Sequence, residues 1–241
     1  MTVQQHQLAR SLLLLLTVAH PALGQPAPNP LVTIDTGQHT YRIPYEYLSI
    51  RPPPGMVEPV NHWRRFSFAF WMPDGRPSQQ AGHELGTLRP QEPGAPPPGP
   101  DSYVVIATNV TAWEGPDSVP RPGQQLENYL WGGGGSDRYE YQTRFGMLEV
   151  LPKPDFPAPF DMYLGVRNFP DLPIETSALV SCPRHDEWAV NHICDGMVAL
   201  QRLEVTFHIR LPTERMDQLM DAVGVAAHLL AKWSNFDLHS K

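Results

Sequence analysis

The only two cysteines of the chain lie in one short segment, SCPRHDEWAVNHICDG, together with two histidines. Cys182, His185, His192 and Cys194 place four possible metal ligands within thirteen residues. Thiolate sulfur and imidazole nitrogen are the ligands of structural zinc sites, so a metal site is one interpretation of this segment. The two cysteines can instead form a disulfide, and the histidines are then loop residues without an assigned role.

The N-terminus favours the disulfide. Residues 1–24 have the pattern of a signal peptide, with Arg10 before the apolar run Leu12–Leu16 and small residues at Ala22 and Gly24. Export to the periplasm or the medium places the cysteines in an oxidising compartment. A disulfide that closes a loop of about thirteen residues contributes roughly 3 kcal/mol in the chain-entropy model. We therefore expect a Cys182–Cys194 disulfide and no cofactor, with the four-ligand metal site as the alternative.

The usual motifs of nucleophilic and metal-dependent catalysis are missing from the sequence. It contains neither Gly-x-Ser-x-Gly nor Ser-x-x-Lys, and His83-Glu84 is followed by Thr87 where a zinc protease would have its second histidine. Acidic residues such as Glu140 and Asp161 are scattered, which leaves glycoside hydrolysis open. The sequence therefore favours a protein without enzymatic activity but does not decide the question.

The charge and the aromatic residues bear on possible partners. A formal net charge of −7 without a basic stripe disfavours nucleic acid, and no later segment is long and apolar enough to anchor the mature chain in a membrane. Trp113, Tyr129 and Trp131 flank loops, where exposed aromatic side chains suit a protein or sugar partner. We predict these three as partner-binding residues, while the oligomeric state stays open.

Proline dominates the composition, with 28 residues in 241. Proline removes a backbone donor and is poorly tolerated inside helices and central strands, so we expect short strands, many rigid loops and little helix. Residues 25–30 read as an extended leader, and residues 73–101 as a flexible proline-rich loop. The segment WGGGGS at 131–136 is expected to lack regular structure. Residues 31–241 are predicted to form a single α+β domain.

Alternating apolar residues predict the strands of this domain. The expected strands are 31–35, 39–43, 64–72, 103–110, 138–151, 160–166 and 200–211. The run 103–110 suits a strand that is buried on both faces, and 138–151 is expected to be broken or bulged at Gly146. The alternation in 200–211 is the clearest, as expected for a sheet with one buried and one wet face. An antiparallel meander follows from these patterns.

One helix is expected, at the C-terminal end. Pro212-Thr213 suits its N-terminal cap, and Glu214 suits its first turn. Apolar residues then recur at spacings of three and four, at Met216, Leu219, Met220, Val223, Ala227 and Leu230. This amphipathic stripe predicts a helix that packs on the antiparallel sheet.

The layout of the chain resembles that of small exported bacterial proteins of the periplasmic immunity type, which neutralise toxins delivered by neighbouring bacteria. The resemblance lies in an early YRIPYEYL, a late pair of cysteines about a dozen residues apart, and an amphipathic strand followed by a helix ending in LLAKWSNF. The long segment 73–101 departs from it. The resemblance implies a disulfide-bonded, non-enzymatic binding protein and assigns no functional residue.

These observations predict an exported, soluble binding protein that inhibits or neutralises a protein partner, with a toxin as the favoured candidate. One alternative is a metal-binding protein or metal-dependent enzyme built on Cys182, His185, His192 and Cys194. The other alternative is a carbohydrate- or envelope-binding module that uses exposed tryptophan and tyrosine side chains.

Overall fold

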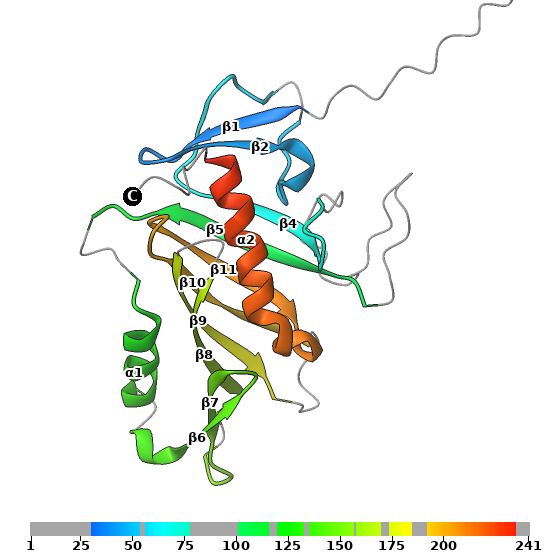
Figure 1. Ribbon diagram of the computed structural model, residues 1–241. Helices are drawn as coiled ribbons and strands as arrows, with labels where there is room; N and C mark the ends of the chain where they lie inside the picture. The colour runs from blue at the N-terminus through cyan, green and yellow to red at the C-terminus, as the bar shows by residue number, and fades with distance from the viewer. Residues whose placement is uncertain are drawn as a thin grey trace, which may run out of the picture.

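The computed structural model describes residues 30–53, 56–77, 101–115, 120–132, 135–156, 158–169, 174–184 and 192–234 (Figure 1). Its strands are β1 Leu31–Asp35, β2 Thr40–Pro44, β3 Asn61–His62, β4 Phe66–Met72, β5 Tyr103–Ala112, β6 Tyr139–Arg144, β7 Met147–Pro152, β8 Phe160–Phe169, β9 Ile174–Pro183, β10 Ile193–Leu200 and β11 Val205–Pro212. Its α-helices are α1 Pro122–Gly132 and α2 Leu219–Trp233, and its short 3-10 helices are η1 Tyr45–Tyr47, η4 Ser136–Arg138 and η5 Thr213–Gln218.

An eight-stranded antiparallel sheet forms the centre of the molecule. Its strand order is β4-β5-β11-β10-β9-β8-β7-β6, so that β6 to β11 follow one another as a meander. The predicted antiparallel meander is thereby confirmed. β5 lies between β4 and β11, and its residues from Tyr103 to Ala107 are buried on both faces, as the run of β-branched residues predicts.

The second layer consists of α2 and a three-stranded sheet of order β2-β1-β3, in which β1 pairs parallel with β3 (Figure 1). One apolar cluster joins both to the large sheet, and it includes Ile34 of β1, Phe207 of β11 and Val223 of α2. Near the end of α2, the Trp233 ring packs edge-on against Tyr47 and Phe68, at centroid distances of 4.9 and 5.0 Å. The predicted C-terminal helix on an antiparallel sheet is therefore present.

The start of this helix differs from the prediction. Residues 213–218 form the 3-10 helix η5, and no side chain caps it at Pro212. The backbone amide of Thr213 instead donates to the carbonyl oxygen of His192 at 3.0 Å, which ties η5 to the segment before β10. The expected N-terminal cap at Thr213 is therefore absent, and a hydrogen bond to the distant residue His192 holds the start of η5 instead.

Helix α1 was not expected, and it lies on the opposite face of the large sheet. Its only deeply buried leucines, Leu126 and Leu130, pack against Val150 of β7 and Met162 of β8. The helix includes Trp131 and Gly132, and Ser136 begins the 3-10 helix η4, so the prediction that WGGGGS lacks regular structure is wrong at these three residues. Pro122 at the first helical position and the leucine pair four residues apart are the signals that indicate a helix here.

Two strand predictions also need correction. The expected strand 138–151 is interrupted at Gly146 as predicted, but the interruption is a full hairpin turn at Phe145 and Gly146, with φ of 55° and 73°, that separates β6 from β7. In β8, the alternation of 160–166 predicts that Phe160, Met162, Leu164 and Val166 point inward; Met162 is buried, but Phe160 and Val166 are 40% and 62% exposed. That face of β8 is covered by α1 only along part of its length, so alternation alone overestimates the burial of its ends.

Several predicted segments lie outside the described residues. These are the signal peptide at 1–24, nearly all of the leader at 25–30, residues 78–100 of the proline-rich segment, and His185. Among the residues that the structure describes, no helix is long and apolar enough to cross a membrane.

Candidate functional site

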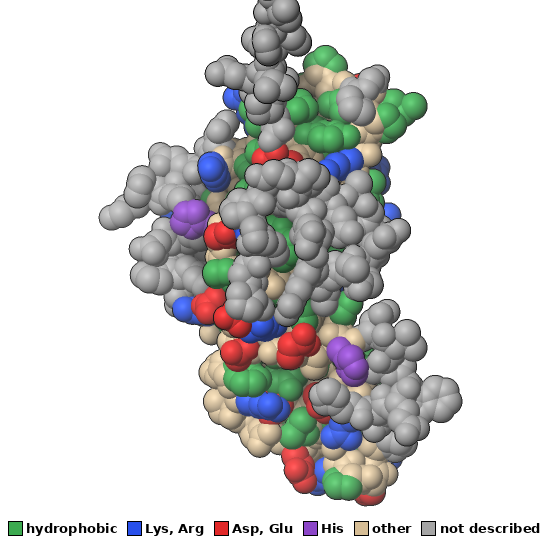
Figure 2. Space-filling view, turned by 90° about the vertical axis from the view of Figure 1, so that its right-hand side faces the viewer, with side chains coloured by type: hydrophobic (Ala, Val, Ile, Leu, Met, Phe, Trp, Pro, Cys, Tyr) green, Lys and Arg blue, Asp and Glu red, His purple; other side chains and the backbone are tan. Residues whose placement is uncertain are grey.

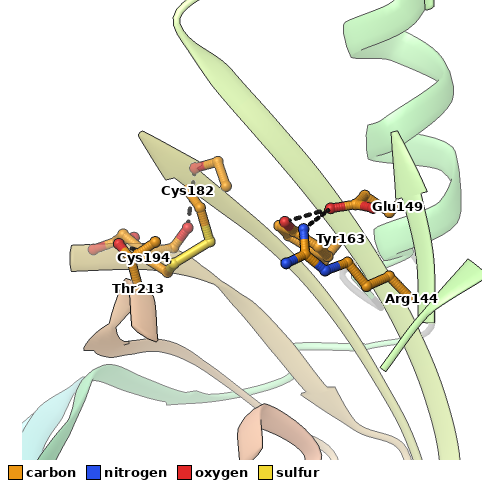
Figure 3. Close-up of a disulfide and its surroundings, with 8 residues drawn as sticks. Arg144, Glu149, Tyr163, Cys182, Cys194 and Thr213 are labelled. Atoms are coloured by element: carbon orange, nitrogen blue, oxygen red, sulfur yellow. Dashed lines mark hydrogen bonds and ion pairs between the residues drawn. A yellow bond between two sulfur atoms is a disulfide. The ribbon is translucent and has the colours of Figure 1, made fainter. Parts of the chain in front are cut away.

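Cys182 at the end of β9 and Cys194 at the start of β10 are joined by a disulfide (Figure 3). Both cysteines are buried, and the Thr213 hydroxyl of η5 lies 3.7 Å from the sulfur of Cys194. The bond consumes the two thiolates that the alternative metal site requires. His192 is exposed, His185 lies outside the described residues, and the described part of the chain holds no cluster of three or more possible metal ligands.

A cleft of about 530 Å³ opens beside this bond, and we call it the disulfide cleft. The hairpin residues Arg144 and Phe145 contribute to its lining, and so do four residues of η5. Its lining residues are Arg144, Phe145, Asp161, Tyr163, Cys182, Pro183, Arg184, His192, Thr213, Glu214, Met216 and Asp217. Residues more than seventy positions apart in the sequence thus meet because β6 to β9 are neighbours in the sheet and η5 follows β11.

A fully buried carboxylate lies behind this lining. Glu149 of β7 is 0% exposed and accepts a hydrogen bond from the Tyr163 hydroxyl at 2.6 Å and one from Arg144 Nη1 at 3.1 Å (Figure 3). The side-chain amide of Gln142 donates a further hydrogen bond to it. A buried charge is tolerated only when it is paired and hydrogen-bonded, and these three donors meet that requirement.

The pKa shifts in this network oppose proton transfer near neutral pH. Burial by itself raises the pKa of Glu149, but the hydrogen bonds from Tyr163, Gln142 and Arg144 outweigh it and hold the pKa below its usual value. Burial and the bond to Glu149 raise the pKa of Tyr163. A general acid or base needs a pKa close to the working pH, so both groups are suited to fixing the hairpin rather than to acid–base chemistry.

The other charges of the cleft fall into two kinds. Arg184 donates to Asp161 at 2.8 Å and to the carbonyl oxygen of Pro152 at 2.9 Å, which fixes both charged side chains. Glu214 and Asp217 of η5 are exposed and form no ion pair with any residue that the structure describes. The cleft therefore offers two unpaired carboxylates beside a paired network.

The three aromatic residues predicted to bind a partner do not meet in one place. The Trp113 ring is half-buried, and its Nε1 donates to Thr206 of β11 at 2.8 Å. Tyr129 of α1 is 39% exposed and lies beside Tyr139 of β6, at the far edge of the same sheet. Trp131 belongs to α1, but its side chain lies outside the described residues. A role for each residue alone stays a prediction.

The residues of the buried network were missed in the sequence. Glu149 occupies an inward position of β7, between the apolar residues Met147 and Leu151 of the same face. A charged residue at an inward position of a strand indicates a buried partner, and this signal could have identified Glu149. Its donors could not have been named, because they depend on the pairing of β7 with β6 and β8.

Comparison with known proteins finds the fold but no family. No protein-family model matches the chain, and no curated protein matches its sequence. An immunity protein of the Stenotrophomonas maltophilia type IV secretion system has a similar structure, with a TM-score of 0.53 and 11% identity over 85% of this chain and 93% of that one. At this identity the likeness shows a related fold only.

The iron-regulated outer membrane lipoprotein FrpD of Neisseria meningitidis is also similar in structure. Its TM-score is 0.45, with 12% identity over 86% of this chain and 94% of that one. A TM-score at this level supports no inference about the present chain.

Proposed function

We propose that this protein is an exported, non-enzymatic binding protein that inhibits a protein partner, as an immunity protein does with a toxin. The observation that carries the proposal is the fold shared with an immunity protein over 85% of this chain and 93% of that one. A buried disulfide, which forms and persists in oxidising compartments, supports export. The disulfide cleft supports a binding role, because its lining combines exposed carboxylates with a half-exposed aromatic ring.

The pKa shifts of Glu149 and Tyr163 support binding over catalysis, since they keep the carboxylate charged and the phenol neutral near pH 7. Under this proposal the partner reaches the protein in the periplasm or outside the cell. The expected partner is a toxin, and the purification experiment described below is designed to identify it.

The test begins with the full chain, tagged at its C-terminus and expressed in the organism that encodes it. Purification from the periplasm is expected to recover one protein in stoichiometric amount. That protein, produced alone in the periplasm of a test host, should stop growth, and co-production of the present chain should restore it. Recovery of no stoichiometric partner, or of a partner that is harmless to the host, would contradict the proposal.

A further inference from the structure

We propose that the disulfide cleft receives an arginine side chain of the partner protein, an inference that rests on the binding function proposed above. The chain has a net charge of −7, and Figure 2 shows acidic side chains, with Lys and Arg side chains between them, on the side of the molecule that carries η5 in Figure 1. A basic partner group is therefore attracted to this side over a distance of about one Debye length, roughly 8–10 Å at ordinary ionic strength.

The unpaired charges that line the cleft are negative, so they favour a positively charged ligand. Asp161 and the buried Glu149 already have arginine partners, at 2.8 and 3.1 Å. Glu214 and Asp217 lie three residues apart on η5, both line the cleft, and neither forms an ion pair with the described residues. An incoming cation would thus find two carboxylates in the lining of the cleft that have no ion-pair partner among the described residues.

The shape of the cleft suits a long side chain. Its volume of about 530 Å³ exceeds what one ion needs, and buried apolar or aromatic side chains of Tyr163, Cys182 and Met216 contribute to its lining. Arginine has an apolar stem and a charged tip, so it can cover such a lining with its stem while its tip meets carboxylates at the mouth.

Phe145 favours a guanidinium over an ammonium group. The guanidinium carbon of Arg144 lies 4.7 Å from the centroid of the Phe145 ring, and Phe145 as a whole residue is 45% exposed. The ring therefore already binds one guanidinium and has surface left for a second. A planar guanidinium group can lie flat on an aromatic ring and pair with two carboxylate oxygens in a fixed fork, whereas a lysine ammonium interacts as a compact point charge.

The backbone at Phe145 supplies an independent reason to assign it a role. Its φ is +55°, a left-handed conformation, and Gly146 follows with +73°. Two-residue hairpin turns of this kind favour asparagine, aspartate and glycine, and a bulky aromatic residue is strained there. Strained residues concentrate at functional sites, and this one places an exposed ring at the cleft.

The test uses a defined probe, so that no partner has to be known. The full mature chain, labelled with ¹⁵N, is titrated with the blocked peptide acetyl-Gly-Arg-Gly-amide and followed by NMR. We expect binding in the millimolar range, with shifts confined to residues 144–145, 161–163, 182–184 and 213–217. The isosteric citrulline peptide, which lacks the charge, should leave these signals unmoved, and the lysine peptide should bind more weakly than the arginine peptide.

Two variants measure separately how the carboxylates of Glu214 and Asp217 and the ring of Phe145 contribute to binding of the peptide. Glu214→Gln with Asp217→Asn should raise the Kd for the arginine peptide roughly threefold to tenfold, as expected for the loss of two exposed charge pairs. Glu114→Gln with Glu127→Gln removes the same charge from exposed residues outside the cleft and should leave the Kd unchanged. Phe145→Asn should raise the Kd of the arginine peptide, because the aromatic ring is lost. It should also raise the urea midpoint of unfolding, because asparagine tolerates the left-handed backbone conformation better than phenylalanine does. A purely structural role would not couple those two effects.

The proposal is overturned if the citrulline peptide binds as well as the arginine peptide, if the lysine peptide binds as tightly as the arginine peptide, or if the shifts spread over acidic residues elsewhere. It is also overturned if the control pair weakens binding as much as the cleft pair. Each of these outcomes leaves the proposed function standing when the partner experiment succeeds, since a toxin could be bound by another surface. Failure to capture any partner contradicts the proposed function, whatever the peptide does.

Discussion

Glu149 carries a buried carboxylate, and its charge must be compensated by hydrogen-bond donors within the fold. It is fully buried, and its three donors come from β6 and β8, the two strands that flank β7 in the sheet. A buried acceptor removed from such a network leaves its donors unsatisfied, which costs more than the hydrogen bonds themselves contribute. The network therefore determines how firmly the hairpin that carries Phe145 is held beside the cleft.

Glu149→Ala is expected to lower the free energy of unfolding by about 2–4 kcal/mol, because the Tyr163 hydroxyl and the Gln142 amide lose their acceptor. Glu149→Gln keeps an acceptor for Tyr163 and should cost about 1–2 kcal/mol. Urea unfolding at pH 7 measures both, with Glu114→Gln as an exposed control. Equal losses for the alanine and glutamine variants would show that the network contributes nothing beyond charge.

A second carboxylate, Asp195 of β10, predicts the response of stability to acid. Burial raises the pKa of Asp195, but hydrogen bonds from His208 and Arg210 outweigh it and lower the pKa below its usual value. A carboxyl group with a lowered folded pKa stabilises the fold fully above its unfolded pKa, about 3.9 for aspartate, and this contribution is lost as the pH falls through the folded value.

We therefore expect the free energy of unfolding to decline as the pH falls below about 4. Asp195→Asn should be less stable than the natural chain at pH 7, and the difference should shrink towards pH 3. Thermal unfolding followed by circular dichroism between pH 3 and pH 7 measures this. A difference that stays constant over the whole range would mean that the ion pairs of Asp195 make no contribution to stability.

At the scale of elements, the approach of neighbouring strands depends on glycine at one position. A Cβ atom at Gly196 of β10 would lie 2.3 Å from the carbonyl oxygen of Leu179 and 2.4 Å from the Cα of Val180, both in β9. At Gly165 of β8, a Cβ atom would meet the sulfur of Met220 at 2.7 Å. Backbone atoms of a paired strand cannot yield, whereas a methionine side chain can change its rotamer.

Gly196→Ala should therefore destabilise the fold by about 2–4 kcal/mol, or prevent folding, because β9 and β10 would have to separate. Gly165→Ala is the matched comparison and should cost about 1 kcal/mol or less, since Met220 can move. Urea unfolding of both variants gives the comparison. If Gly165→Ala proves the more costly of the two, the packing of α2 on β8 is tighter than the β9–β10 pairing.

At the scale of the whole molecule, the disulfide fixes the region where the cleft, the sheet and η5 meet. It joins the ends of β9 and β10, and Thr213 of η5 contacts one of its sulfurs. The bond closes the connection between these two strands, which limits the freedom of the unfolded chain. The position of η5 relative to the sheet thus depends on a covalent link as well as on packing.

Replacement of Cys182 and Cys194 together by serine should lower the free energy of unfolding by about 3 kcal/mol. The variant should keep the circular dichroism spectrum of the natural chain, because the β9–β10 ladder continues beyond the bond. Dithiothreitol should destabilise the natural chain and leave the double variant unchanged. An equal response of both proteins to the reductant would show that the bond is not the source of the difference.

Local pattern was enough to predict a large part of this protein. The alternation of β11 predicts which side chains are buried, because a strand with one wet face repeats every two residues. The apolar stripe of α2 predicts its helix and its buried face for the corresponding reason, with a period of 3.6 residues. The pairing of Cys182 with Cys194 was predicted without any knowledge of the fold, from the signal-peptide pattern and an even number of cysteines.

Only the tertiary structure decided the rest. Local signals in the sequence are compatible with helix α1, but only the sheet on which Leu126 and Leu130 pack decides that the helix forms and where it lies. Glu149 has its donors, and Glu214 and Asp217 line the same cleft as Phe145, because strand register and the path from β11 into η5 bring distant residues together. Contacts between residues that are distant in the sequence depend on long-range strand pairing, which local periodicity does not encode. The strands could therefore be predicted from the sequence, but the candidate site could not.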